Sequence, residues 1–309
     1  MDTNFNSLMQ EALLEILHKH YGLECAALQF LREGGSRTYL VEGTQKYLLK
    51  VIGASFAATA RESVSIMQYL EKKGFPVPKT ILTQAGDPLL VVPVGEEDRL
   101  IVVQEYIDGE EPDLTVRAVD VGTLTGQLHS LLEHYPGNLV AHSKQFFIGR
   151  YLDFLRQKEY PRLSVYERLG DSLWQRVKDL PKGNCHGDLH RGNLLESSDG
   201  QIYLLDFDTV CDAPIMFDVM VMCDMTDYFH LKQTDIETTK AVYERFLTGY
   251  SKYRTLSSAE QESFYDWVAI RHFQLQATIL ELYGIDCIDE RFIDTQLDWL
   301  ERWMQATEG

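Results

Sequence analysis

The sequence is poor in cysteine and has no long apolar runs, which excludes several classes of protein. Its five cysteines are scattered, and no two have the short spacing of a zinc knuckle, so neither a knuckle nor a disulfide framework is expected. The longest apolar runs, such as 89–94, are far too short to span a bilayer. Residues 1–20 carry acids and lack a basic leader, which predicts a cytoplasmic protein without a secretory signal.

Basic charge is also scarce. The chain has 47 acidic residues against 29 lysines and arginines, a formal net charge of -18. Such a field repels phosphate backbones, and the sequence contains no concentrated basic patch, so nucleic acid is not an expected partner. A cationic small molecule would be attracted, although solubility alone also accounts for an acidic surface.

The amino-terminal part of the chain is predicted to be rich in β-strands. Short apolar runs alternate with turn formers such as Glu33-Gly34-Gly35, which is typical of antiparallel strands. The strands are expected at 26–31, 37–42, 46–52, 89–93 and 100–106. Apolar residues at helical spacing predict helices at 8–20 and 57–73, which end at Gly22 and Gly74.

The rest of the chain has a predominantly helical pattern. Helices are predicted at 113–134, 150–160, 164–178, 216–229, 235–251, 259–283 and 290–306. One β patch interrupts them, at 193–196 and 201–206 around a Ser-Ser-Asp-Gly turn. A segment with the composition of a linker precedes the helices. The chain therefore divides into an amino-terminal lobe, a hinge and a helical lobe, at 1–104, 105–112 and 113–309.

The strongest chemical pattern is the run His-Gly-Asp-Leu-His-Arg-Gly-Asn at 186–193, followed by Asp206-Phe207-Asp208. It supplies a carboxylate at Asp188, an amide oxygen at Asn193 and a second carboxylate at Asp206 across a hairpin. Magnesium takes a few hard oxygen ligands from protein, and phosphoryl transfer needs both metal and an aligned hydroxyl. The pattern predicts that Asp188 orients a hydroxyl while Asn193 and Asp206 hold Mg2+.

This order and spacing resembles the aminoglycoside phosphotransferase and choline kinase superfamily, whose catalytic loop reads H-G-D-x-H-x-G-N. The resemblance extends over residues 34–218. It implies an α+β, protein-kinase-like two-lobed fold with a small antiparallel-sheet N-lobe and a large helical C-lobe. It also implies transfer of the γ-phosphate of ATP or GTP to a hydroxyl of a small molecule, such as an aminoglycoside, choline, homoserine or a sugar.

Under this resemblance Lys50 and Glu62 take nucleotide-binding roles. Lys50 ends an apolar stretch of a predicted strand, where a lysine is seldom buried without a partner. The family places such a lysine on the α and β phosphates, braced by a glutamate of the next helix, which Glu62 matches. The alternative is a lysine that protects the edge of a sheet from aggregation.

Two further segments are expected at the nucleotide. The loop Gly34-Gly35-Ser36 loosely matches the family pattern G-x-S/N-x-x-Y/F, and its small residues would let backbone N–H groups approach phosphates. A plain hairpin turn is the alternative there. The stretch Gln-Glu-Tyr-Ile-Asp-Gly at 104–109 resembles the family's hinge, where backbone groups near Glu105 and Ile107 would bind adenine.

Other interpretations stay open at several positions. The spacing of His186 and His190 also suits zinc ligands on a helix, but the adjacent glycines favour a loop. Asp208 stands where protein kinases have the glycine of D-F-G, and only eleven residues separate Asp206 from Asp218, too few for an activation loop. The alternative functions are a protein Ser/Thr kinase and a nucleotide-binding regulatory protein without turnover. A P-loop motif is absent from the sequence.

The acceptor is indicated only by charge. Acidic and aromatic residues gather in the helical part, at Asp224, Asp227, Tyr228, Asp235, Glu281, Tyr283, Asp286, Asp289 and Glu290. If they line a cleft, they suit an amine-bearing acceptor, and if they face solvent, a neutral sugar or a homoserine-like acceptor stays open. Three residues are predicted to be structural: His129 as a buried side chain, His186 as an anchor of its loop and, as the resemblance implies, Asp218 as the group that holds the catalytic-loop backbone.

Overall fold

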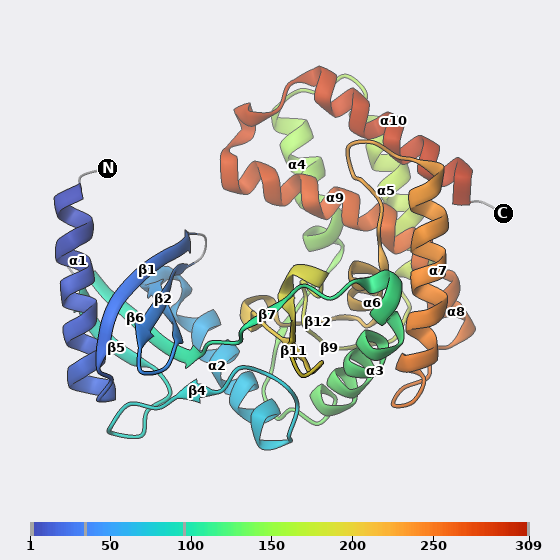
Figure 1. The fold of residues 1–309 in the computed structure, drawn as a ribbon. Helices are drawn as coiled ribbons and strands as arrows, with labels where there is room; N and C mark the ends of the chain where they lie inside the picture. Colours follow the sequence, from blue (N-terminus) through green and yellow to red (C-terminus); the bar gives the residue numbers. More distant parts are fainter. Residues whose placement is uncertain (1–2, 34–35, 95–96, 308–309) are drawn as a thin grey trace. The chain divides into compact units, whose positions relative to one another are not determined.

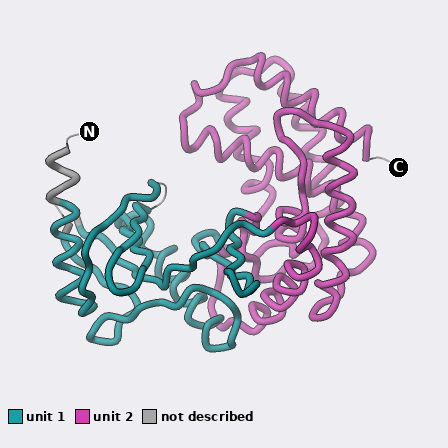
Figure 2. The backbone as a smooth tube through the Cα atoms, viewed as in Figure 1, with its two compact units in different colours: residues 1–112, 192–209 teal, residues 113–191, 210–309 magenta. Residues whose placement is uncertain are grey.

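The chain forms two compact units (Figure 2). Unit 1 comprises Met1–Pro112 and Gly192–Thr209, and unit 2 comprises Asp113–Arg191 and Val210–Gly309. The backbone therefore leaves one unit for the other at three points. In this computed structural model the described residues are 3–33, 36–94 and 97–307.

A six-stranded antiparallel sheet is the framework of unit 1 (Figure 1). Its strands are β1 (Cys25–Glu33), β2 (Ser36–Gly43), β3 (Tyr47–Gly53), β4 (Thr80–Ile81), β5 (Leu90–Val94) and β6 (Glu97–Glu105). Their order is β1-β2-β3-β6-β4, and β5 pairs with β6. The sequence predicted each of these strands except the two-residue β4. Strand β6 begins earlier than predicted because its pairing with β5 extends to Glu97.

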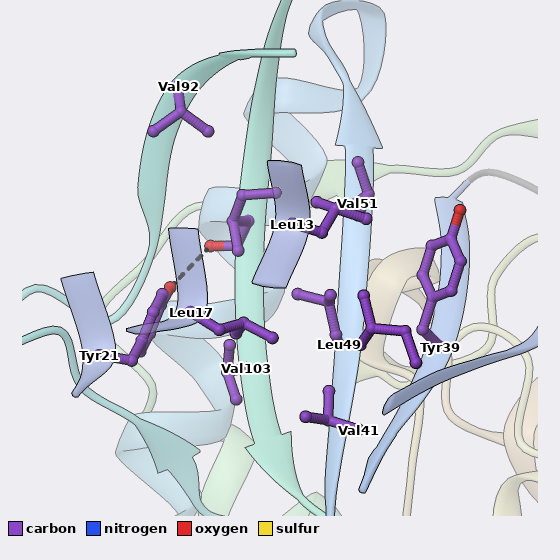
Figure 3. Close-up of a cluster of buried hydrophobic side chains, with 11 residues drawn as sticks. Leu13, Leu17, Tyr21, Tyr39, Val41, Leu49, Val51, Val92 and Val103 are labelled. Atoms are coloured by element: carbon purple, nitrogen blue, oxygen red, sulfur yellow. Dashed lines mark hydrogen bonds between the residues drawn. The ribbon is translucent and has the colours of Figure 1, made fainter. Parts of the chain in front are cut away.

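One face of this sheet packs against helix α1 (Thr3–Ile16) and the π-helical turn η1 (Leu17–Tyr21). The core on this face contains Leu13, Leu17, Tyr21, Leu28, Tyr39, Val41, Leu49, Val51, Val92, Ile101 and Val103 (Figure 3). The Tyr21 hydroxyl donates a hydrogen bond to the Ile101 carbonyl oxygen at 3.3 Å, which satisfies it within the core. Gly22 ends the helix as predicted, with a φ of 67°.

The other face packs against α2 (Ala57–Lys72). The cluster there consists of Ile52, Ala60, Val64, Leu100 and Val102, so its strand residues are the direct neighbours of those that face α1. Successive residues of a strand point to opposite faces, which separates the two clusters. Lys50, two positions before Ile52, consequently lies on the α2 face.

Residues 192–209 pack with unit 1, although they lie within the helical part of the sequence. They form the predicted hairpin of β10 (Leu194–Ser197) and β11 (Ile202–Leu204), followed by the 3-10 turn η5 (Phe207–Thr209). Strand β10 also pairs with β7 (Gly109–Glu110), a two-residue strand in the stretch expected to be a linker. The hairpin thereby brings Asn193 and Asp206 into the sheet-bearing unit.

Unit 2 is mainly helical, as predicted. Its helices are α3 (Leu114–Leu132), α4 (Arg150–Gln157), α5 (Leu163–Val177), α6 (Met216–Cys223), α7 (Gln233–Tyr250), α8 (Ser258–Glu262), α9 (Phe264–Tyr283) and α10 (Glu290–Thr307). Helix α9 contacts α4, α5, α6 and α10, so it is the central element of the unit (Figure 1). Among the described residues, no helix is both long and apolar enough to cross a membrane.

Two helix predictions in unit 2 are wrong in their extent. The helix expected at 216–229 ends at Cys223, because Asp224 is extended and its Oδ1 accepts the N–H of Thr226 at 3.0 Å. This side-chain turn replaces the next helical hydrogen bond. The helix expected at 259–283 is divided into α8 and α9 at Ser263.

A second error concerns a small sheet in unit 2. The sequence predicted a single β patch among the helices, but β8 (Val140–Ala141), β12 (Cys211–Pro214) and β9 (Lys182–Cys185) form a further sheet in that order. These strands are so short that no alternation of apolar and polar residues marks them. Strand β9 leads directly into His186, so this sheet anchors the start of the predicted catalytic loop.

Candidate functional site

A buried lysine forms ion pairs with two carboxylates in unit 1. Lys50 Nζ lies 2.8 Å from Asp206 Oδ1 and 3.3 Å from Asp208 Oδ2. The lysine side chain is 8% exposed, so the charge needs these partners. Burial alone would lower the pKa of Lys50, but the charges of Asp208 and Asp206 raise it above its usual value. The lysine is therefore a fixed cation at neutral pH.

Asp206 is held from two sides. Its Oδ2 also accepts a hydrogen bond from Arg32 Nη2 of β1 at 2.9 Å. Burial alone would raise the pKa of Asp206, yet Lys50 and Arg32 hold it far below its usual range. Asp206 also has a φ of 62°, in the left-handed region that few residues other than glycine adopt without strain. Its carboxylate is ionised and its backbone is held in a conformation typical of functional sites.

These groups line a pocket of about 230 Å³ on the α2 face of the sheet. Its walls come from β1, β2, β3, α2, the 104–107 segment and the hairpin. The lining residues are Leu31, Arg32, Thr38, Leu48, Lys50, Met67, Pro78, Gln104, Glu105, Tyr106, Ile107, Gly192, Asn193, Leu195, Leu205 and Asp206. Five of the residues singled out in the sequence thus share one cavity: Lys50, Glu105, Ile107, Asn193 and Asp206.

The pocket offers ligands of the type that magnesium prefers. Asn193 is 6% exposed, and its carbonyl oxygen accepts the Leu205 N–H at 2.9 Å, which ties it to the residue before Asp206. The Asn193 amide and the Asp206 carboxylate both supply hard oxygens, so the donor set fits Mg2+. Among the described residues, no group of three or more His, Cys, Asp or Glu side chains could hold a metal ion.

The 105–107 segment forms another wall of this pocket. The Glu105 N–H donates to the Lys79 carbonyl oxygen at 2.8 Å, which fixes the end of β6. Within the described residues no hydrogen bond is found for the N–H or the carbonyl oxygen of Ile107. Backbone groups without internal partners that line an apolar-walled pocket are suited to a planar polar ring.

Other predicted nucleotide-binding residues are only partly described. Gly34 and Gly35 lie outside the described residues. Ser36 begins β2, opposite Ile52 of β3. Glu62 is half-buried in α2, and its bracing of the lysine stays a prediction.

In unit 2, a buried aspartate holds the loop that begins at His186. Asp218 of α6 is fully buried and accepts the N–H groups of His186 at 2.6 Å and of Gly187 at 2.9 Å. Gly187 has a φ of 84°, which a residue with a side chain would rarely adopt. His129 Nε2 lies 3.1 Å from Asp218 Oδ2. As the sequence indicated, His129 is buried and Asp218 holds this loop.

His186 is buried and serves the same loop. Its Nδ1 accepts the N–H of Asp188 at 3.4 Å. The ring is 0% exposed, and the backbone around it is a loop rather than a helix. This arrangement supports the structural role over the zinc alternative.

Asp188 lies between a histidine and an arginine. Its Oδ1 is 2.9 Å from Arg271 Nη2, and its Oδ2 is 3.5 Å from His190 Nε2. Burial alone would raise the pKa of Asp188, but hydrogen bonding to His190 and the charge of Arg271 lower it to about 2. The carboxylate is therefore ionised throughout the neutral range. That Asp188 meets Asn193 and Asp206 around one ion stays a prediction.

The sequence interpretation missed Arg271 and the pairing of Arg32. Arg271 is the one charged residue in the stretch Trp-Val-Ala-Ile-Arg-His-Phe at 267–273, and it is 8% exposed. A lone arginine on the buried side of an apolar helix needs a partner, so this apolar stretch could have identified Arg271 from the sequence. The arginine at 32 offered no such signal, because it lies in an exposed strand position.

Comparison with solved structures supports the fold. The structure of a microcompartment-associated aminopropanol kinase has a TM-score of 0.77 at 18% identity, over 96% of this chain and 98% of that one. Amicoumacin kinase hAmiN in complex with AMP-PNP, Ca2+ and Ami has a TM-score of 0.74 at 18% identity, over 99% and 97%. The predicted α+β, protein-kinase-like fold is confirmed.

Sequence comparison gives the family. A homoserine kinase of Hyphomonas neptunium is 23% identical over 277 residues, which cover 84% of this chain and 82% of the relative. The phosphotransferase enzyme family matches residues 27–260. The resemblance to small-molecule phosphotransferases is therefore confirmed, and the expected enzyme class with it. Because the match extends over more than half of its length, the chain belongs to the phosphotransferase enzyme family.

Proposed function

We propose that this enzyme transfers the γ-phosphate of a magnesium nucleotide, ATP or GTP, to a hydroxyl of a small molecule. The observation that carries the proposal is the pocket of unit 1, in which buried Lys50 pairs with ionised Asp206 beside Asn193. Phosphoryl transfer is catalysed mainly by positioning and by charge stabilisation. A fixed cation and two hard oxygen ligands in one cavity supply both.

Different residues of the pocket would bind different parts of the nucleotide. Ile107 would bind the adenine through its backbone, and Glu105 through its carbonyl oxygen, because its N–H already donates to Lys79. Lys50 would contact the α and β phosphates. Asn193 and Asp206 would hold Mg2+, which when bound neutralises phosphate oxygens. For this, Asp206 must exchange one of its present cationic partners for the metal. Arg32 is 61% exposed and is the partner that can leave at less cost.

Asp188 is the proposed catalytic residue. With a pKa of about 2 it binds almost no proton near neutrality, so it would orient the acceptor hydroxyl as a hydrogen-bond acceptor. Removal of its charge should therefore lower kcat while leaving nucleotide affinity nearly unchanged.

The acceptor class is left to experiment, because two of the acids of unit 2 that could attract a cation are already paired. Asp224 accepts a 2.6 Å hydrogen bond from the Tyr228 hydroxyl, and Glu281 pairs with Arg150 at 2.6 Å. These carboxylates already have partners within the unit. They give weak support to a cationic acceptor, so neutral and amine-bearing alcohols should be tested side by side.

The test is magnesium-dependent consumption of ATP and GTP by the purified chain. The panel should contain homoserine, an amino alcohol, choline, an aminoglycoside and a simple sugar. Asp188→Ala should lower kcat strongly while leaving a measurable residual rate, and Asp206→Asn should abolish the effect of Mg2+ on nucleotide binding. Asp199→Ala is a matched control, because Asp199 is exposed in the turn between β10 and β11.

Each alternative has its own outcome. Phosphorylation of a peptide and of none of the small molecules would favour a protein kinase. Tight nucleotide binding without transfer to any compound would favour a regulatory protein. Full activity of the Asp188→Ala variant would contradict the proposed catalytic role.

A further inference from the structure

The guanidinium of Arg271 is in direct contact with the Asp188 carboxylate within unit 2. Its Nη2 lies 2.9 Å from Asp188 Oδ1, although 83 positions separate the two residues in sequence. Arg271 belongs to α9, whereas Asp188 follows β9. We infer that Arg271 is a positioning residue that fixes the orientation and the charge of the Asp188 carboxylate. This inference rests on the proposed function, in which Asp188 orients the acceptor hydroxyl.

The arginine is itself held by its own helix. Its Nη1 donates to Gln274 Oε1 at 2.7 Å, and Gln274 Nε2 donates in turn to Thr278 Oγ1 at 3.3 Å. Residues three and four apart share one face of a helix, so this chain of bonds runs along a single side of α9. The Arg271 guanidinium also lies 5.6 Å from the ring centre of Phe217. At 8% exposure it has little freedom to turn toward solvent.

A preorganised guanidinium constrains the carboxylate that it contacts. The contact of Asp188 with His190 is longer, at 3.5 Å, and the His190 side chain is 44% exposed, so the buried arginine constrains the carboxylate more strongly. Arginine presents planar, fixed donors, whereas a lysine at the same position would present a mobile point charge. The hydroxyl to be phosphorylated must meet the Asp188 oxygen in a narrow range of directions, because small misplacements of a reacting group lower rates strongly.

The arginine also opposes the effect of burial on Asp188. Burial favours the neutral carboxylic acid, while His190 and Arg271 favour the carboxylate. Titratable and charged groups that face Asp188, its loop or Arg271 include His190, Asp218, Asp224 and Tyr228, and Arg191 belongs to the same loop. Arg271 is a permanently charged cation in direct contact with the Asp188 carboxylate. Its removal should therefore raise the pKa of Asp188 toward the range in which enzymes are assayed.

The first test needs no acceptor. Side-chain carboxyl 13C signals of aspartate are titrated by NMR, and Asp188 is assigned by its loss in Asp188→Asn. In the wild type this signal should stay at its ionised position down to about pH 4. In Arg271→Met it should titrate at least one pH unit higher, with Arg271→Lys between the two. Arg176→Met is the matched control, since Arg176 of α5 forms a 2.8 Å ion pair with Asp266, which belongs to α9 like Arg271.

The second test uses the acceptor that the panel identifies. Arg271→Met should lower kcat at least tenfold at pH 7, change the KM for nucleotide less than threefold, and add an acidic limb to the pH profile. Arg271→Lys should recover part of the rate. In an Asp188→Asn background the Arg271→Met substitution should have almost no further effect, because its role passes through Asp188.

The outcomes separate this inference from the proposed function. If no acceptor is found, the proposed function fails, while the NMR titration still decides whether Arg271 controls Asp188. If Arg271→Met does not fold, the titration of Arg271→Lys and its kcat decide in the same way. An unshifted Asp188 titration, or rate losses that multiply in the double variant, would overturn the inference.

Discussion

Replacement of Lys50 by methionine tests the charge cluster of unit 1 directly. Removing one member of a buried ion pair costs about 3–5 kcal/mol, because the other charge is left without its partner. Asp206 is 24% exposed and keeps Arg32, so the lower end applies. We expect Lys50→Met to lower the free energy of unfolding by about 3 kcal/mol at pH 7. Urea unfolding measured by circular dichroism gives this value.

The pH dependence of stability in the same variant tests the ion pair of Lys50 with Asp206. The pKa of Asp206 is depressed in the folded state, so its contribution to stability is present above the unfolded value of about 3.9 and is lost as pH falls through the folded value. The difference between wild type and Lys50→Met should thus be constant from pH 6 to 8 and shrink below about pH 4. Lys72→Met, at the exposed end of α2, should stay within about 0.5 kcal/mol of wild type.

A double-mutant cycle decides whether the stability lost in Lys50→Met comes from its ion pair with Asp206. The cost of Lys50→Met in an Asp206→Asn background should be smaller by about 1–2 kcal/mol. Additive losses, or a Lys50→Met variant as stable as the wild type at pH 7, would refute the assignment of Lys50 and Asp206 as a coupled pair.

Further predictions concern unit 2. Burial lowers the pKa of His272 to about 3, so the unfolded state binds its proton first and stability falls as pH drops below about 6.5. Between pH 7 and pH 5 the wild type should lose about 2 kcal/mol of its free energy of unfolding through His272, and His272→Leu should not show this loss in urea unfolding. The same pH dependence of stability in the variant and the wild type would contradict this prediction. A Cβ at Gly249 would lie 1.9 Å from the Val119 carbonyl oxygen. Gly249→Ala should therefore lower the free energy of unfolding by about 3 kcal/mol or more. Gly53→Ala is the control: the closest atom to its Cβ would be the end of the Arg99 side chain at 3.0 Å, so it should cost less than about 1 kcal/mol. If Gly249→Ala melts at the same temperature as the wild type, α3 and α7 can move apart to accommodate the methyl group, and the prediction is wrong. Asp218→Asn should destabilise by about 3 kcal/mol and increase amide exchange at residues 186 and 187, since the carboxylate accepts both of their N–H groups. Unchanged exchange would contradict its role in the loop.

Local sequence patterns were sufficient for much of the site. The residues Asp188, Asn193 and Asp206 fall within one run and one hairpin, so the sequence alone suggested them as site residues, and their roles stay predictions. The strands of the main sheet were also found, because alternating runs between turn formers persist over several residues. Lys50 was recognised as a buried cation from its apolar neighbours.

Long-range pairings were not accessible in the same way. The partners of Lys50 lie more than 150 positions away in sequence, at Asp206 and Asp208, and Arg32 reaches Asp206 across a similar span. No periodicity reports such contacts, since they depend on how the hairpin packs against the sheet. The end of α6 was missed for a local reason: Asp224 caps a turn with its side chain, and the apolar pattern continues past it.

The crossing pattern of the chain has a consequence for dissecting this enzyme. Because the backbone changes unit after Pro112, Arg191 and Thr209, no single cut separates the two units into continuous pieces. A fragment truncated at Pro112 would lack the hairpin and would expose a lysine with no counter-ion from Asp206 or Asp208. Fragments intended to bind nucleotide must therefore carry 192–209 as well, joined through a new linker, and a protease nick within that hairpin should affect unit 1 before unit 2.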